Sequence, residues 1–229
     1  WITQSVAAGV TAPSGALDAF DAKVLGGVGA EGILAPPDEW LLPQGYLKPY
    51  AAVRHVHYAA AAALRWHEAS PANTAQILTM RVQTYREAIT YCGNRAPRTA
   101  IQAQFSISFG VAAALVLGDL GPGAYAASAL FDPEIMRLES VIEIVPYPDC
   151  NDESARAATV SITMAKGTVV YESGNVPGDA RSPMVGQLLR EKFARYVEPV
   201  LGRARTDDLA VSILEAPGNV PMPDVTNAS

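Results

Sequence analysis

The sequence predicts an α+β fold, with a small antiparallel sheet and packed helices. Two strand-like segments, ATVSITM and TVVYES, flank Lys166 and Gly167, a pattern typical of a β-hairpin and therefore of antiparallel pairing. Helical and strand-like segments also mix without the regular alternation that builds a doubly wound parallel sheet. Because 49% of the 229 residues are hydrophobic, the chain can bury a substantial core.

The first half of the chain is predicted to be mainly helical. Residues 2–12 carry small and apolar side chains at helical spacing, whereas residues 25–40 hold too many glycines and prolines for a regular element. Alanines predict a helix from Val56 to Glu68, and alternating apolar residues predict a strand that runs through Tyr85. The segment from Thr99 to Leu117 is apolar on most faces, so we expect one buried helix there.

The second half adds strands and ends in helices. Asp132, followed by Pro133, predicts the N-cap of a short helix that reaches Leu138, and the segment VIEIVPY after it alternates as a strand does. The hairpin comes next. We expect two further helices, from Met184 to Leu201 and from Thr206 to Glu215, before a proline-rich tail.

These elements suggest three parts. Residues 1–35 are predicted to be the end of a helical domain with a glycine-rich connection, residues 36–183 the α+β domain, and residues 184–229 the C-terminal helices and tail. The sequence starts at Trp1 rather than at a methionine, so we expect either that it has been trimmed or that it is a piece of a longer protein.

The composition disfavours several classes of function. With a net charge of −6 and only 17% charged residues, the chain has no basic field to attract nucleic acid. No apolar run approaches the ~20 residues that span a bilayer, so no membrane association is expected. Cys92 and Cys150 lack C-x-x-C spacing and cannot form a disulfide framework, which favours a cytoplasmic location. Gly26, Gly27 and Gly29 do not form a dinucleotide-binding fingerprint.

A cluster of cationic residues precedes the alanine-rich helix, in the segment KPYAAVRHVH. Pro49 holds the backbone beside Lys48 extended, so the ammonium would point in a fixed direction and suit a carboxylate ligand. Arg54 could clamp a second carboxylate, and His57 would have a pKa near the working pH for proton transfer. The residues alone equally allow solvated cations beside an ordinary helix start.

The histidines of this cluster do not predict a metal site. His55 and His57 would share a face only on a strand, because two residues on a helix diverge by about 200°. No acidic or cysteine ligand accompanies them at local spacing. We therefore predict no bound metal.

Three segments, in the same order, resemble the MmgE/PrpD family. They are KPYAAVRHVH with its small-residue helix, the AQFS segment at 103–106 with its apolar helix, and the run from Gly178 to Met184 with Lys192 and Phe193. The family includes 2-methylcitrate dehydratase, cis-aconitate decarboxylase and iminodisuccinate epimerase. The resemblance runs from about Gly9 to about Leu214 and covers only the C-terminal half of family members.

This resemblance implies an incomplete site in the chain alone. A helical domain, in the same gene or on a separate chain, would supply many active-site groups, while the α+β domain would cover the cleft as a lid in a homodimer. Lys48 is implied to face the substrate carboxylates, and His57 to donate a proton or orient a neighbour. Arg54, Ser106 and Phe109 are implied substrate-binding positions, although Phe109 replaces a tyrosine that many members carry near the substrate.

The predicted function is therefore that of a lyase, a dehydratase that acts on a small polycarboxylic acid such as 2-methylcitrate. Family reactions build negative charge on a carbon next to a carboxylate, which fixed cations stabilise and which an acid–base group assists by roughly 10²–10⁴-fold. No cofactor is needed for such steps. An isomerase or epimerase, a decarboxylase, and a non-catalytic half that binds a helical partner chain remain as alternatives.

Overall fold

The computed structural model describes residues 7–9, 11, 14–27, 45–70, 73–148, 156–178 and 182–214. The chain forms two compact units, Trp1–Pro43 and Gln44–Ser229. In the first unit the structure places α2 (Ala16–Phe20), which continues as the π-helix η1 (Asp21–Leu25). Most of the helix predicted over residues 2–12 and most of the glycine-rich passage lie outside the described residues.

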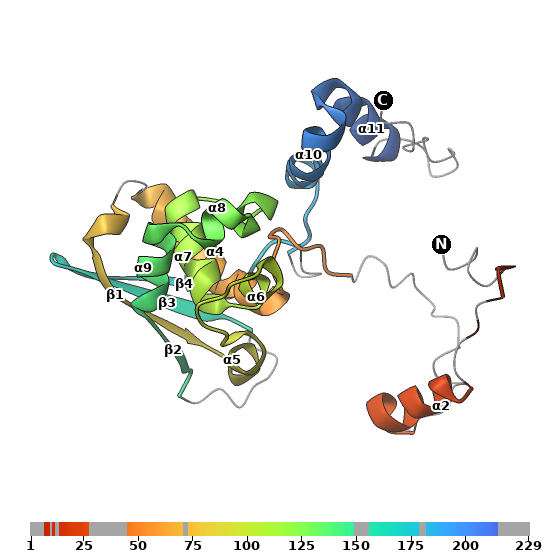
Figure 1. The fold of residues 1–229 in the computed structure, drawn as a ribbon, viewed down its shortest axis with the longest axis horizontal. Coiled ribbons are helices and arrows are strands. Elements are labelled where there is room, and N and C mark those ends of the chain that lie inside the picture. The colour runs from red at the N-terminus through yellow and green to blue at the C-terminus, as the bar shows by residue number, and fades with distance from the viewer. Residues whose placement is uncertain are drawn as a thin grey trace. The chain divides into compact units, whose positions relative to one another are not determined.

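The second unit is built on a four-stranded sheet with the strand order β2-β1-β3-β4 (Figure 1). Its strands are β1 (Ile77–Thr84), β2 (Ile142–Pro146), β3 (Ala158–Met164) and β4 (Gly167–Ser173). Strand β3 pairs antiparallel with both β1 and β4, but β1 and β2 pair in parallel. The α+β prediction is confirmed, and the sheet is mixed rather than wholly antiparallel.

The parallel pair follows from the chain between β1 and β2. A parallel neighbour needs a long crossover that returns the chain to the same end of the sheet. Here the crossover consists of helices, which are α5 (Arg86–Cys92), α6 (Ala100–Gln104), α7 (Ile107–Leu117), η4 (Pro122–Tyr125), α8 (Ala127–Leu130) and α9 (Pro133–Ser140). The alternating patterns in the sequence mark the strands but not this connection, so the parallel pair was not predicted.

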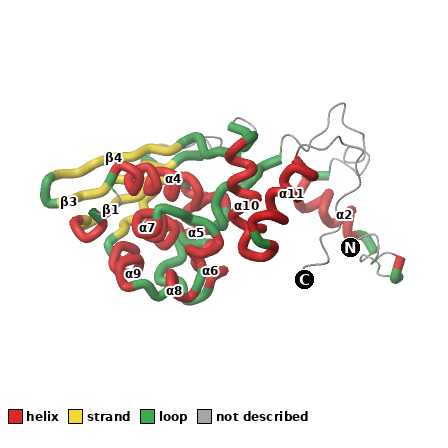
Figure 2. The backbone as a smooth tube through the Cα atoms, turned by 90° about the horizontal axis from the view of Figure 1, so that it is seen from above, coloured by secondary structure: helices red, strands yellow, loops and turns green. Residues whose placement is uncertain are grey.

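The core lies between the helices and one face of the sheet. Figure 2 shows α4, α5, α7 and α9 on the same side of the strands. On β1 the side chains of Met80 and Val82 are buried while Arg81 between them is exposed, as alternation on a sheet covered on one face requires. Val160 and Ile162 continue the buried row on β3. The uncovered face is correspondingly polar.

Helix α4 (Arg54–Ala69) crosses α7 at close range. The alanine-rich prediction is confirmed, and Ala59, Ala60 and Ala63 are buried. A Cβ built on Gly110 of α7 would overlap Cγ1 of Val56, so the two helices approach to a distance that only glycine allows. Small residues on both helices therefore set the spacing of the core.

Two predicted elements differ from the structure. The predicted helix from Thr99 to Leu117 is two helices, because Ser106 takes an extended conformation and caps α7 by accepting a hydrogen bond from the Phe109 N–H. Helix α5, directly after β1, was missed. Its buried residues Ala88 and Cys92 are four positions apart, which is a helical spacing that the alternating pattern upstream concealed.

Other local predictions are confirmed. Asp132 caps α9, its Oδ1 accepting hydrogen bonds from the N–H groups of Glu134 at 2.8 Å and Ile135 at 3.0 Å. The hairpin forms, with Met164 paired to Gly167, so the turn residues are Ala165 and Lys166, one position earlier than predicted.

The remaining helices are η3 (Thr74–Gln76), α10 (Gln187–Leu201) and α11 (Arg203–Leu214). Helix α10 begins three residues after the predicted start. Gly186, directly before it, has a φ of 55°, which is not a helical conformation. Within the described part of the chain, no helix has both the length and the apolar character needed to cross a membrane.

Candidate functional site

A cavity of about 410 Å³ in the second unit brings together the three segments on which the sequence comparison depends. Its walls come from the chain before α4, from the end of α6 and from α10. The lining residues are Lys48, Tyr50, Ala51, Ala52, Val53, Gln104, Phe105, Lys192 and Tyr196. Residues that are far apart in the sequence thus form one concave surface.

Two lysines give this cavity its charge. Lys48 is exposed and Lys192 is half-buried, with its Nζ 5.8 Å from the ring centroid of Tyr196. Among the described residues, no carboxylate lies within ion-pair distance of either ammonium. An anionic ligand would therefore meet two cations without first displacing a partner.

Backbone hydrogen bonds hold the Lys48 segment against the rest of the unit. The Leu47 N–H donates to the Gly178 carbonyl at 2.9 Å, and the Ala51 N–H donates to the Leu120 carbonyl at 2.9 Å. The Val53 N–H donates to the carbonyl of Gln104 at 3.1 Å, which ties the segment to α6. Three anchors over seven residues keep the start of the segment in place without any regular secondary structure.

His57 is completely buried, directly behind this segment. Its Nε2 donates to the Ala52 carbonyl at 3.1 Å, so its Nδ1 is unprotonated and accepts from the Tyr46 hydroxyl at 2.7 Å. Burial, with the nearby charges of Lys48 and Arg54 as smaller causes, lowers the pKa of His57 to about 4, although the Ala52 bond opposes this. The expectation of a pKa near neutrality is therefore wrong.

Arg54 does not lie among the described residues that line the cavity. Its Cζ is 4.3 Å from the ring centroid of Tyr46, the residue whose hydroxyl donates to His57. Arg54 and His57 therefore both contact Tyr46. Tyr46 lies two residues before Lys48.

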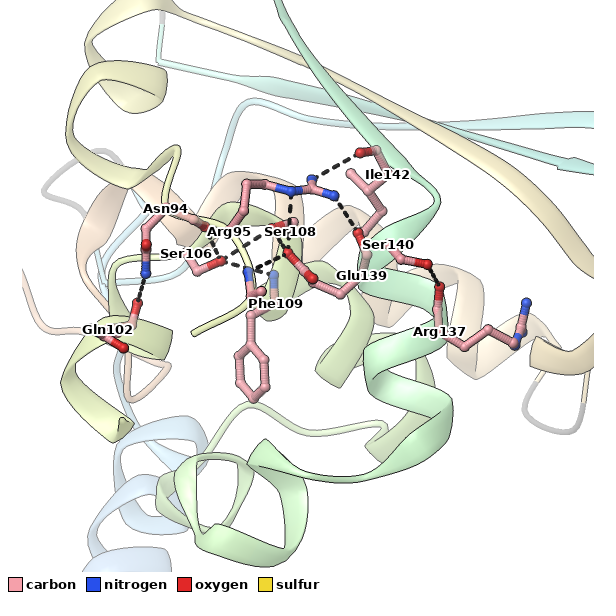
Figure 3. Close-up of polar contacts among 11 residues, drawn as sticks. Asn94, Arg95, Gln102, Ser106, Ser108, Phe109, Arg137, Glu139, Ser140 and Ile142 are labelled. Carbon is pink, nitrogen blue, oxygen red and sulfur yellow. Dashed lines mark hydrogen bonds and ion pairs between the residues drawn. The ribbon is translucent and has the colours of Figure 1, made fainter. Parts of the chain in front are cut away.

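Ser106 and Phe109 lie in a second region, at the start of α7 (Figure 3). The buried Ser106 hydroxyl donates to the Asn94 carbonyl at 2.6 Å and lies 3.2 Å from the Ser108 hydroxyl. Phe109 is buried, with its ring 6.0 Å from that of Tyr125, and it lines a different cavity from the one that contains Lys48. The structure does not bring the five predicted residues into one pocket.

The cavity contains residues that sequence reasoning did not single out. They are Tyr50, Gln104, Lys192 and Tyr196. A signal existed for three of them, because Tyr50 belongs to the KPYAAVRHVH segment, Gln104 to the AQFS segment and Lys192 to the Lys-Phe pair used for the resemblance. None of the three was assigned a role, since the sequence does not show that these segments meet at Lys48.

The histidines of the cluster have separate environments. His55 Nδ1 lies 2.7 Å from the Tyr85 hydroxyl, and its ring stacks on Tyr91 at 5.7 Å between centroids, whereas His57 contacts Tyr46 and Ala52. In the part of the chain that the structure describes, no three His, Cys, Asp or Glu side chains gather as metal ligands would.

Fold and site together define the class, an α+β domain with a mixed sheet covered by helices on one face and a cavity that carries two lysines. A comparison with protein families identifies it: residues 50–216 match the MmgE/PrpD C-terminal domain. The chain belongs to the MmgE/PrpD family, of which it carries the C-terminal domain. The match begins at Tyr50, two residues after Lys48. The comparison with curated proteins finds no match.

Proposed function

We propose that this chain is the C-terminal domain of a cofactor-independent lyase, a dehydratase that acts on a small polycarboxylic acid such as 2-methylcitrate. The observation that carries the proposal is the pair Lys48 and Lys192 on one cavity, with no described carboxylate to neutralise either. Two cations on one concave wall suit a ligand with at least two carboxylates.

The main contribution of this domain to the proposed reaction is fixed positive charge. Removing a proton from the carbon beside a carboxylate places negative charge on that carboxylate, and a cation already aimed at it stabilises the charge without reorganisation. Lys48 suits this role because hydrogen bonds at Leu47 and Ala51 hold its backbone on either side. Lys192 would hold a second carboxylate and orient the substrate.

His57 enters this proposal as a positioning residue. An imidazole with a pKa of about 4 is neutral at physiological pH, and both of its nitrogens already have partners, Ala52 and Tyr46. It therefore orients the backbone behind Lys48 rather than donating a proton itself. The acid and base would come from a helical domain, on the same or on a separate chain, in an enzyme that is a homodimer.

The decisive experiment neutralises each lysine in the complete enzyme, with its helical part present. Lys48→Met and Lys192→Met are compared with Lys166→Met, which lies at the exposed hairpin turn. A hydrogen bond to a charged group contributes about 1.5–3 kcal/mol, so kcat/KM should fall about 10–150-fold in the first two variants and stay unchanged in the third.

The substrates to assay are 2-methylcitrate, cis-aconitate and iminodisuccinate. Water loss from 2-methylcitrate supports the dehydratase, whereas turnover of only cis-aconitate or only iminodisuccinate would assign the chain to a decarboxylase or an epimerase of the family. No turnover of any of the three by an assembled enzyme would favour a non-catalytic half. Unchanged kinetics in Lys48→Met and Lys192→Met on an active substrate would sink the proposed site.

A further inference from the structure

A second cavity, of about 560 Å³, lies at the start of α7, between the loop before α6 and helices α8 and α9. It is lined by Ala96, Pro97, Arg98, Phe109, Leu130, Phe131, Met136, Glu139 and Ser140. None of these residues lines the cavity that contains Lys48. Its volume is within the range of small-molecule sites, which is about 300–1,000 Å³.

The walls of this cavity are mainly apolar. Phe109 and Leu130 are buried, while Phe131 is 60% exposed and Met136 is 54% exposed. Large apolar side chains that stay this exposed around a hollow mark a surface able to bind an apolar group. The walls alone do not say which ligand fits.

Glu139 supplies the polar feature of the cavity. Its side chain is only 9% exposed. Its Oε1 accepts from the Ser108 hydroxyl at 2.7 Å and the Ala96 N–H at 3.2 Å, and it lies 3.3 Å from Arg95 Nε. In Figure 3 the dashed lines end on one of the two carboxylate oxygens. No described residue donates to Oε2, so this oxygen is a fixed acceptor beside the apolar walls.

The charges around the cavity favour a ligand that carries a carboxylate. Arg95 neutralises Glu139, and it also donates to the carbonyl oxygens of Glu139 at 2.7 Å and Ile142 at 2.9 Å. Arg98 adds a further positive charge to the lining and has no ion-pair partner among the described residues. A carboxylate would compensate Arg98, while a hydrogen-bond donor would satisfy Glu139 Oε2.

We propose that this cavity binds a small amphipathic monocarboxylate that carries a hydroxyl or ammonium group next to an apolar side chain. The carboxylate lies at Arg98, the donor bonds Glu139 Oε2, and the apolar group packs on Phe109, Leu130 and Met136. Such a ligand satisfies the fixed acceptor, the extra cation and the apolar walls at once. This site shares no lining residue with the cavity that contains Lys48.

The test is a calorimetric titration of the full chain with 2-hydroxy-3-phenylpropanoate, phenylalanine and 3-phenylpropanoate. The third probe lacks the donor and should bind at least about 10-fold more weakly than the better of the other two, as expected for a hydrogen bond to a charged group. The first two probes distinguish a hydroxyl from an ammonium donor. The proposal would be overturned if none of the three probes showed saturable binding, or if all three bound with equal affinity.

Two variants locate the site. Arg98→Met should weaken the binding of all three probes about 10-fold or more. In Glu139→Gln an amide NH₂ replaces the accepting Oε2, so the probes with a donor should bind no more tightly than 3-phenylpropanoate. Arg81→Met and Glu143→Gln are the controls, since these exposed residues pair with each other on the sheet. Should Glu139→Gln fail to fold, Met136→Trp at the mouth of the cavity must abolish binding. Undiminished binding in Arg98→Met or Met136→Trp refutes the site.

Discussion

Gly178 makes the position of Lys48 sensitive to a single methyl group. Its backbone has a φ of 99°, and a Cβ at this position would overlap the carbonyl oxygen of Leu47, the residue before Lys48. The Leu47 N–H also donates to the Gly178 carbonyl. We predict that Gly178→Ala lowers the stability of the domain and displaces Lys48.

The magnitude follows from three contributions. A left-handed backbone costs an L-residue about 1–2 kcal/mol, and losing the Leu47 hydrogen bond costs about 0.5–1.5 kcal/mol. Alanine also lowers the conformational entropy of the unfolded chain, which stabilises the folded variant by about 0.4–1 kcal/mol. The free energy of unfolding should therefore fall by about 0.5–3 kcal/mol, measured by urea denaturation followed by circular dichroism.

Two further glycines separate the causes. Gly174→Ala has an ordinary backbone, and its new Cβ would meet only the Ala157 Cβ at 3.7 Å, so its stability should change by less than about 0.5 kcal/mol. Gly202 has a φ of 74° in open space, so Gly202→Ala measures the backbone cost alone. If Gly178→Ala is as stable as Gly174→Ala and keeps full kcat/KM in the complete enzyme, the argument for a close approach at Lys48 is refuted.

Three other predictions concern the core. As the pH falls from 7.5 to 5, His57 becomes protonated in the unfolded chain, near pH 6.5, but stays neutral in the folded chain, where its pKa is about 4. His57 should therefore lower the free energy of unfolding by about 2 kcal/mol over this range. A series of urea denaturations in which His57→Gln shows the same dependence on pH would contradict this prediction. Gly110→Ala should destabilise by about 1–3 kcal/mol despite its better helix propensity, and Val56→Ala in the same chain should relieve the overlap, which a double-mutant cycle measures. Ser108→Ala removes a buried donor to a carboxylate and should cost about 1–3 kcal/mol in thermal or urea unfolding; the exposed Ser140→Ala should cost less, and equal losses would count against the buried network.

Local signals explain which elements could be predicted from the sequence. The alanine run of α4, the Asp132-Pro133 start of α9 and the β-hairpin each depend on residues a few positions apart. Helix α5 was missed because its buried residues follow directly on the alternating pattern of β1, with no turn residue between them. The division of the 99–117 segment into two helices depends on the conformation of Ser106. Both misses involve boundaries, where neighbouring tendencies compete.

The site was less predictable than the fold. Lys48 was recognised because proline and the following helix mark its segment, but its counterpart Lys192 lies on α10, far along the chain. The sequence also suggested that His57 has a pKa near the working pH, because no local pattern indicates its burial. Its burial depends on Tyr46, Ala52 and the helices packed around it, and no local pattern reports that.

The sequence by itself determined the α+β class, the order of most elements and the three segments that mark the MmgE/PrpD family, because periodicity, capping and motif residues act over short distances. Only the tertiary structure decided that these segments meet at one cavity with two lysines, that β1 and β2 run parallel, and that His57 is neutral. Contacts between distant segments and the loss of water around a buried group exist only once the chain has folded.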